Sequence, residues 1–217
     1  MLARLFEQLL ADLKSDFADD QAEFRIEGLS GYANINSSVN LVAYPRSVPV
    51  VQALIRWCYD HTVSVIPRGG GFSYGEIAMN DAGIVIHSKH LKKIINFDQK
   101  VGTLVVEPGV TFQEIIAYTL PLNWLLTPVP GEKEVSIGGA IGCNIHGKNS
   151  WRVGNFASTV KSFDLVNNRG EIQRVTSQEN PEYFDSVLGG LGLIGFVTKI
   201  DLQLEYVQSP FLEVETV

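Results

Sequence analysis

Glycine is gathered into three short segments of this chain, at 69–75, 136–147 and 189–195, and this clustering limits the folds that the chain can adopt. A residue without a Cβ atom lets main-chain segments pass close to one another or to a ligand. An ordinary surface turn requires only one or two glycines, at positions with positive φ. The repeated clusters therefore indicate loops that are shaped around a bound molecule.

The first segment follows an apolar run at 63–66 and has the composition of an anion-binding loop. With the Cβ atoms removed from the turn, successive N–H groups can converge on a phosphate. Arg68 adds positive charge beside the turn, and Ser73 adds a hydroxyl donor. A tight surface turn without a ligand is the alternative. The candidate binding residues of this loop are Arg68, Gly69, Gly70, Gly71, Phe72, Ser73 and Tyr74.

The second segment is rich in small residues and ends in two ionisable side chains, His146 and Lys148. Its backbone can lie flat against a planar or extended ligand, and both side chains can face a bound anion or a redox-active ring. For His146, a hydrogen-bonded histidine in the core is the alternative. Cys143 has no basic neighbour in the sequence, which predicts a small buried packing residue rather than a nucleophile.

The third segment contains Gly190, Gly192 and Gly195 at the spacing of the dinucleotide-binding fingerprint. That fingerprint follows a strand and opens a helix. Here the pattern follows a predicted helix at 180–188 and opens a predicted strand, so we reject a Rossmann fold. The sequence also lacks a Gly-Lys-Ser/Thr phosphate loop and a His-Glu-x-x-His motif, and a hydrolase of the Ser/His/Asp type is unsupported.

Charge and cysteine content narrow the function further. Lys plus Arg number 17 against 24 Asp plus Glu, a net charge of −7, and no basic cluster appears that would neutralise the phosphates of a nucleic acid. The two cysteines, Cys58 and Cys143, are far apart and lack the spacing of metal ligands. We therefore expect no nucleic-acid partner, no metal site and a reducing compartment, with the cytoplasm as the location.

The N-terminal residues 1–22 predict an amphipathic helix, because Phe6, Leu9 and Leu13 recur at helical spacing. Docking on its own domain or on another subunit is favoured over a membrane interface. No run of the sequence approaches the roughly 18–20 apolar residues of a transmembrane helix. The chain is therefore expected to have no transmembrane segment.

The remaining pattern predicts an α+β fold with two lobes. Residues from about 23 to 90 predict a small α/β lobe. The segment 22–40, at the start of this lobe, is predicted to be irregular and polar. Residues 91–206 predict a larger lobe with a mostly antiparallel sheet and flanking helices, since turn residues at 98–102 and 167–170 separate strand-like runs.

Several motifs, taken in order, resemble the FAD-binding domain, also called the PCMH-type domain, of the vanillyl-alcohol oxidase superfamily. They lie at 67–75, 106–111, 130–139, 146–149 and 189–195. No single motif carries the resemblance, which covers about residues 25–206. Within the superfamily, the segment at 138–156 is most similar to the decaprenylphosphoryl-ribose oxidases, the flavin subunits of a two-component sugar epimerase.

The resemblance implies a cofactor site between the two lobes, with the FAD pyrophosphate on residues 69–73 and 136–139. It places His146 and Lys148 at the reacting end as orienting or electrostatic groups. Many relatives tether the flavin through a histidine at the position of Phe72, so noncovalent FAD is expected here. The further cofactor-binding residues that it implies are Gly131, Ser136, Ile137, Gly138, Gly139, Cys143, His146, Gly147, Asn149 and Val197.

The resemblance also implies an activity, the FAD-dependent oxidation of a sugar or polyol hydroxyl by hydride transfer to flavin. A lipid-linked sugar is one candidate substrate, and the reductase of an epimerase pair is a candidate partner. With such a substrate, the cytoplasmic protein would be peripheral to the inner membrane. An aldonolactone, alditol or hydroxyacid oxidase and a noncatalytic FAD-binding fragment stay open as alternatives. Enzymes of the family continue into a substrate-binding cap domain, which we expect to start at 207–217 and to be otherwise missing from this chain.

Overall fold

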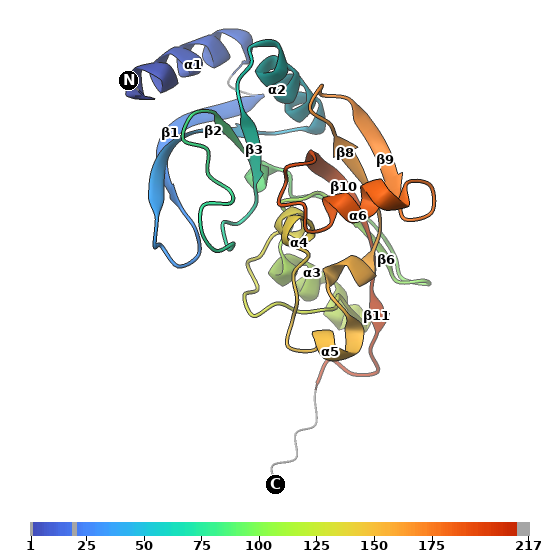
Figure 1. Ribbon diagram of the computed structural model, residues 1–217. Helices are drawn as coiled ribbons and strands as arrows, with labels where there is room; N and C mark the ends of the chain where they lie inside the picture. Colours follow the sequence, from blue (N-terminus) through green and yellow to red (C-terminus); the bar gives the residue numbers. More distant parts are fainter. Residues whose placement is uncertain (1, 19–20, 212–217) are drawn as a thin grey trace.

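The chain forms two lobes, each built on its own sheet, in a computed structural model that describes residues 2–18 and 21–211 (Figure 1). The first lobe holds four strands in the order β1-β2-β4-β3, with β1 antiparallel to β2 and the other neighbours parallel. Its elements are α1 (Leu2–Asp16), β1 (Ala22–Ser30), β2 (Ser37–Pro45), α2 (Val48–Asp60), β3 (Val65–Arg68) and β4 (Ile84–His87).

The second lobe has a sheet of five antiparallel strands in the order β5-β6-β10-β8-β9. Its strands are β5 (Ile94–Asp98), β6 (Thr103–Val106), β8 (Val160–Val166), β9 (Ile172–Thr176) and β10 (Phe196–Gln203), beside a two-stranded ladder of β7 (Trp124–Leu125) and β11 (Glu205–Tyr206). Its α-helices are α3 (Phe112–Thr119), α4 (Ile137–Cys143), α5 (Ser150–Val153) and α6 (Pro181–Val187). Short 3-10 helices lie at Ser88–His90, Leu120–Leu122 and Phe156–Thr159. The predicted α+β class and the antiparallel larger sheet are confirmed.

One expectation for the first lobe is wrong. Residues 22–40, predicted to be irregular, form β1 and the first part of β2, which pair over nine residues each. Ala22 and Phe24 face the core, whereas Ile26 on the same face of the strand is 39% exposed. The edge strand buries only part of one face, so its sequence lacks the regular alternation that identifies a strand.

The N-terminal helix docks on its own domain. Phe6, Leu9 and Leu13 of α1 are buried in the same apolar cluster as residues of α2, β1 and β4. The indole Nε1 of Trp57 donates a hydrogen bond to Asp16 Oδ2 over 2.8 Å, which ties the end of α1 to α2. Of the alternatives for the amphipathic face, packing within this chain is therefore the one observed.

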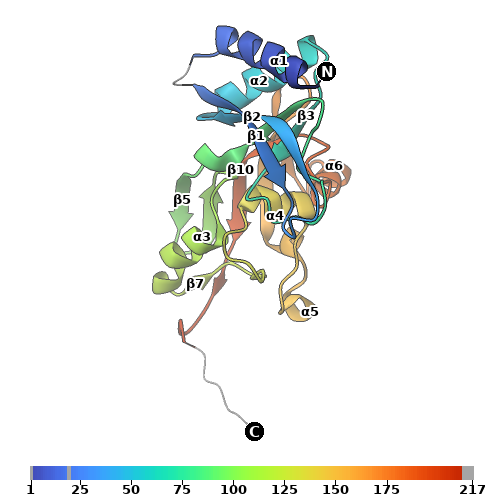
Figure 2. The ribbon, with the colours of Figure 1, turned by 90° about the vertical axis from the view of Figure 1, so that its left-hand side faces the viewer.

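The two lobes share a core at their junction. Val166 of β8 and Phe196 of β10 belong to the apolar cluster of the first lobe, although their strands lie in the second sheet. Gln52 Nε2 of α2 donates a hydrogen bond to the carbonyl oxygen of Gly170 over 3.0 Å, in the turn between β8 and β9. The side view in Figure 2 places α4 between the sheets of the two lobes. The junction therefore fixes the position of the segments that surround α4.

A cap domain was expected to start at 207–217. Of this segment, residues 207–211 follow β11 and residues 212–217 lie outside the described residues. The predicted domain boundaries stay a prediction. Within the described ranges, no helix has the length and apolar character needed to cross a bilayer.

Candidate functional site

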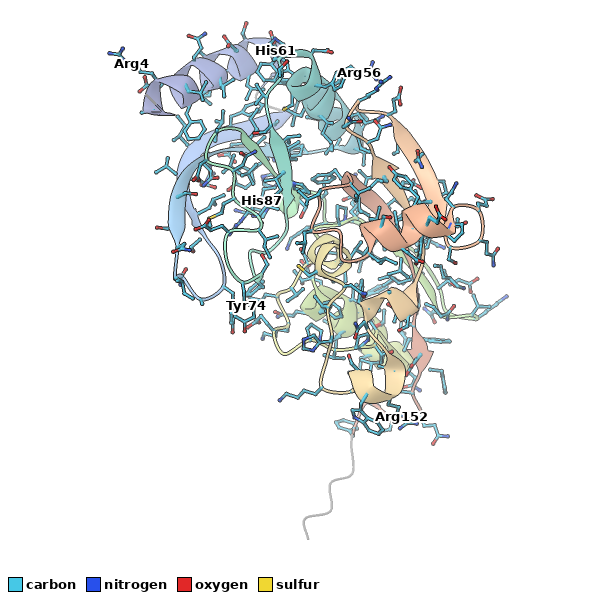
Figure 3. All side chains as sticks on the ribbon, viewed as in Figure 1. Arg4, Arg56, His61, Tyr74, His87 and Arg152 are labelled. Atoms are coloured by element: carbon cyan, nitrogen blue, oxygen red, sulfur yellow. The ribbon has the colours of Figure 1, made fainter. Side chains whose placement is uncertain are left out.

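All three glycine segments border one cavity, which has a volume of about 610 Å³. The first segment contributes residues 69–74 between β3 and β4, and the second contributes one face of α4. The third contributes Leu191, Gly192, Ile194 and Gly195 at the start of β10. Figure 3 shows Tyr74 where the loop of the first lobe reaches toward the second lobe. The cavity has the size of an ordinary small-molecule site.

The segments can touch because two of the glycines have no Cβ atom at the points of contact. A Cβ at Gly69 would lie less than 3.0 Å from Ser136 Oγ, at the start of α4. A Cβ at Gly192, which has a φ of +80°, would lie equally close to Pro67 Cγ. The close approach of the loops therefore depends on glycine at these two positions.

The first glycine loop has free hydrogen-bond donors beside the cavity. Gly70 N–H donates to Ser136 Oγ over 3.2 Å. Within the part of the chain that the structure describes, the N–H groups of Gly71, Phe72 and Ser73 donate to no protein acceptor. Because unpaired amides in a cradle of glycines attract anions, this loop fits the predicted phosphate-binding role.

Arg68 supports the first glycine loop by hydrogen bonds. Its Nη2 donates to the carbonyl oxygen of Ser30 over 2.8 Å and its Nη1 donates to that of Ala78 over 3.1 Å. The guanidinium lies directly under Gly71, and burial lowers its pKa. Arg68 therefore borders the cavity, as expected for a charge beside the loop, and two of its N–H groups also support the loop, while its part in cofactor binding stays a prediction.

The amides at the start of α4 are also used within the protein. Ile137 N–H donates to Val110 O and Gly138 N–H to Pro108 O, both over 2.8 Å, and Gly139 N–H donates to Ser136 Oγ over 3.4 Å. Ile137 is fully buried in the core of the second lobe and, unlike most of the predicted site residues, does not border the cavity. Ser136 accepts two N–H groups, which leaves its hydroxyl proton for a ligand.

Cys143 is exposed and borders the cavity, so the expectation of a buried packing residue is wrong. The helical period of α4 explains this, because Ile137 and Ala140 take the core side and leave Cys143 on the cavity side. Desolvation by the surrounding walls raises the pKa of its thiol, which agrees with the predicted lack of nucleophilic character.

The loop after α4 presents His146 to the cavity. His146 is exposed and borders the cavity, which excludes a core histidine. Lys148 is exposed but does not border the cavity, and neither do Gly147 and Asn149. Gly147 instead allows close packing, since a Cβ there would lie less than 3.0 Å from the carbonyl oxygen of Val129. Of the four predicted residues in this loop, the structure brings only His146 to the cavity wall.

Gly131 and Val197, two of the predicted cofactor-binding residues, both border the cavity. No heavy atom lies within 4 Å of a Cβ built at Gly131. The protein itself therefore does not require glycine at this position, which points to a ligand that approaches the backbone there.

Sequence reasoning missed Tyr32, which lies in the turn between β1 and β2 and borders the cavity. Its N–H donates to the carbonyl oxygen of Ser73 over 3.0 Å, and its ring lies 6.0 Å from that of Phe72 between centroids. The residues around Tyr32 were predicted to be irregular, and no local pattern relates them to a loop so far along the chain. Only the pairing of β1 with β2, which the sequence did not predict, brings Tyr32 to this loop.

Two sequence motifs lie in structural contexts that do not fit their usual roles. The fingerprint at 190–195 follows α6 and precedes β10, which confirms the rejection of a Rossmann fold. Residues 71–75 read Gly-x-Ser-x-Gly, the letters of a hydrolase nucleophile elbow. An elbow joins a strand to a helix. Residues 69–83, all described, run from β3 to β4 without a helix, so Ser73 is not at such an elbow.

Comparison with known proteins agrees with this geometry. A family model described as "FAD binding domain" matches residues 39–176. The chain belongs to this family of FAD-binding domains. The predicted resemblance to FAD-binding domains and the predicted cofactor, FAD, are both confirmed. The match begins in β2 and ends in β9, so it includes the first two glycine segments.

Several relatives of this chain are named as oxidases or dehydrogenases. The chain is 32% identical to decaprenylphosphoryl-beta-D-ribose oxidase of Mycolicibacterium smegmatis, over 75% of this chain and 35% of that protein. It is 31% identical to D-2-hydroxyglutarate dehydrogenase of Xanthomonas citri, over 75% and 36%. It is 25% identical to a glycolate oxidase subunit of Bacillus subtilis, over 87% and 42%. The chain therefore spans well under half of the length of these curated relatives.

The cavity fits FAD on its own features. It runs past unpaired amides of the first glycine loop, the open surface at Gly131 and the Ser136 hydroxyl. An apolar wall of Val187, Leu191, Ile194 and Phe196 suits one of the two ring systems of a dinucleotide. Groups of three or more residues that would ligate a metal are absent from the described ranges.

Proposed function

We propose that this chain is the FAD-binding part of an oxidoreductase that oxidises a hydroxyl group of a sugar or polyol, similar to decaprenylphosphoryl-ribose oxidase. The observation that carries the proposal is the cavity on which three glycine segments converge in an FAD-binding family domain. The identity to a ribose oxidase over three quarters of the chain supports the substrate class. When bound, FAD would accept a hydride from the carbon that carries the hydroxyl group.

The residues of the chain have separate tasks in this proposal. The amides at 71–73 bind the cofactor's phosphates, with the Ser136 hydroxyl as a further donor. Gly131 lets the cofactor lie against the main chain. The absence of an imidazole at Phe72 removes the usual attachment point, so FAD is held without a covalent bond.

His146 and Lys148 act at the reacting end. His146 borders the cavity, and its imidazole can accept a hydrogen bond from the substrate hydroxyl and take up the hydroxyl proton. The Lys148 ammonium is exposed on the same loop, outside the cavity wall, and its positive charge acts at longer range on negative charge that develops on the same oxygen. Asn149 and Gly147 shape the loop that carries both side chains.

The relatives also favour a second candidate, a hydroxyacid oxidase or dehydrogenase. The D-2-hydroxyglutarate dehydrogenase matches the same share of this chain at nearly the same identity as the ribose oxidase. An aldonolactone or alditol oxidase is a further variant of the same chemistry. Because the chain spans about a third of the length of its relatives, a noncatalytic FAD-binding fragment is the third candidate.

The remaining parts of the proposal concern the cellular setting. A lipid-linked sugar as substrate would place the protein at the cytoplasmic face of the inner membrane, with the reductase of an epimerase pair as its partner. We propose domain limits of 1–22 for the N-terminal helix and 23–206 for the FAD-binding domain, with 207–217 leading into a cap domain.

The test is an anaerobic reduction experiment on the purified chain after reconstitution with FAD. Loss of the oxidised flavin spectrum on addition of a sugar or polyol supports the proposal, and loss with 2-hydroxyacids alone supports the second candidate. Bound FAD that no compound reduces identifies a noncatalytic fragment. A protein that takes up no FAD would overturn all three candidates.

A further inference from the structure

The turn between β1 and β2 is joined to the first glycine loop, although the two are far apart in the sequence. Tyr32 N–H donates to the carbonyl oxygen of Ser73 over 3.0 Å. The ring centroid of Tyr32 lies 6.0 Å from that of Phe72 and 5.7 Å from that of Tyr74. The turn therefore contacts Ser73 and both of its neighbours in the chain.

Gly31 makes this contact possible. A Cβ at Gly31 would lie less than 3.0 Å from the carbonyl oxygen of Gly75 and 3.0 Å from that of Ser73. Both are main-chain atoms, which cannot rotate aside as the end of a side chain can. The turn and the loop are thus packed backbone against backbone.

Arg68 adds a second connection between the two segments. Its Nη2 donates to the carbonyl oxygen of Ser30, at the end of β1, and its Nη1 donates to that of Ala78, after the loop. The guanidinium therefore joins the beginning of the turn to the far end of the glycine loop. Together, these contacts hold the loop at both ends and at its centre.

The packing of the two tyrosine rings in this contact is not explained by burial in a core. Tyr32 is 49% exposed and Tyr74 is 70% exposed, so their rings gain little from removal from water. Both border the cavity, next to the unpaired amides at 71–73. A loop of consecutive glycines has many conformations available, and ordering it on binding costs affinity. Contacts that order it beforehand reduce that cost.

We propose that the turn at 30–32 is a clamp that holds the glycine loop in its cofactor-binding conformation, and that Tyr32 is a positioning residue for FAD. The proposal rests on the binding of FAD at this loop. It assigns to the cofactor site a segment that lies before the residues matched by the family model.

The test measures the dissociation constant of FAD by titration of the full chain with flavin fluorescence as the signal. Tyr32→Ala should weaken FAD binding about tenfold, which corresponds to about 1.4 kcal/mol. Tyr32→Phe keeps both ring contacts and should stay within about twofold of the wild type. Gly31→Ala displaces the whole turn and should weaken binding at least as much as Tyr32→Ala.

The matched control is Tyr118→Ala. Tyr118 lies on α3, away from the cavity, is 46% exposed, and has its ring centroid 6.0 Å from that of Phe97. Tyr118→Ala therefore removes the same side chain at a similar exposure, together with a contact to a phenylalanine ring at the same centroid distance. FAD affinity should not change.

A second measurement separates positioning from general destabilisation. In the FAD-free protein, chymotrypsin should cleave after Phe72 or Tyr74 several times faster in Tyr32→Ala than in the wild type, and at the wild-type rate in Tyr118→Ala. A wild type that does not bind FAD would reject the proposed cofactor site. A wild type that binds FAD, with Tyr32→Ala binding equally well or Tyr118→Ala weakened as much, would reject the clamp alone.

Discussion

The contact between Gly69 and Ser136 predicts that Gly69→Ala destabilises the protein before any cofactor binds. The new methyl group would lie less than 3.0 Å from Ser136 Oγ and 3.4 Å from the Cα of Gly139. Either the loop moves away from α4 or the Ser136 side chain turns aside. The first response separates the loop from α4, and the second breaks the hydrogen bonds that Ser136 Oγ accepts.

The two responses have similar costs. Displacement of packed segments by an added methyl group costs about 1–3 kcal/mol. Rotation of Ser136 gives up the hydrogen bonds that its Oγ accepts from Gly70 N–H over 3.2 Å and Gly139 N–H over 3.4 Å, at about 0.5–1.5 kcal/mol each. We therefore expect the free energy of unfolding to fall by about 2 kcal/mol.

Urea denaturation of the FAD-free protein measures this change. With an m-value of about 2 kcal/mol per M, the midpoint should fall by about 1 M. Gly28→Ala is the control, because no heavy atom lies within 4 Å of a Cβ at Gly28. An unchanged midpoint for Gly69→Ala would mean that the loop and α4 do not pack together as described.

Three further substitutions test the site and the first lobe. Gly131→Ala should leave the unfolding free energy within about 0.5 kcal/mol of the wild type yet weaken FAD binding in calorimetric titration, because its methyl group points into open cavity space. Lys148→Met should retain FAD but slow its anaerobic reduction by substrate, and an equal loss of FAD affinity would contradict the assigned role. Burial, with help from Arg68, lowers the pKa of His87 to about 4. Since the unfolded chain binds this proton first, stability should fall by up to about 3 kcal/mol between pH 6.5 and 4, and urea midpoints of His87→Gln should fall less.

The sequence predicted the second lobe well because its signals are local. Hairpin turns join β5 to β6 and β8 to β9, as the turn residues at 98–102 and 167–170 indicated. Thr111 and Glu114 form a complete capping box at the start of α3. Each of these features depends on residues within a few positions of one another.

The errors arise where the decisive contact is distant in the sequence. Tyr32 belongs to the site only because β1 pairs with β2 and carries the turn to Ser73. Cys143 lies at the cavity, and Ile137 in the core, because α4 turns one face to the core and the other to the cavity. The period of 3.6 residues could have separated those two faces, whereas nothing near Tyr32 indicates its partner.

The core shared by the lobes has a consequence for biosynthesis. Val166 and Phe196 complete the apolar cluster of the first lobe, yet they leave the ribosome long after β1 to β4. Until residue 196 has emerged, the apolar cluster of the nascent first lobe lacks two of its members and stays partly open to water. Because contacts of such sequence separation form slowly, this stage of translation is the one at which chaperones would find an exposed surface to bind.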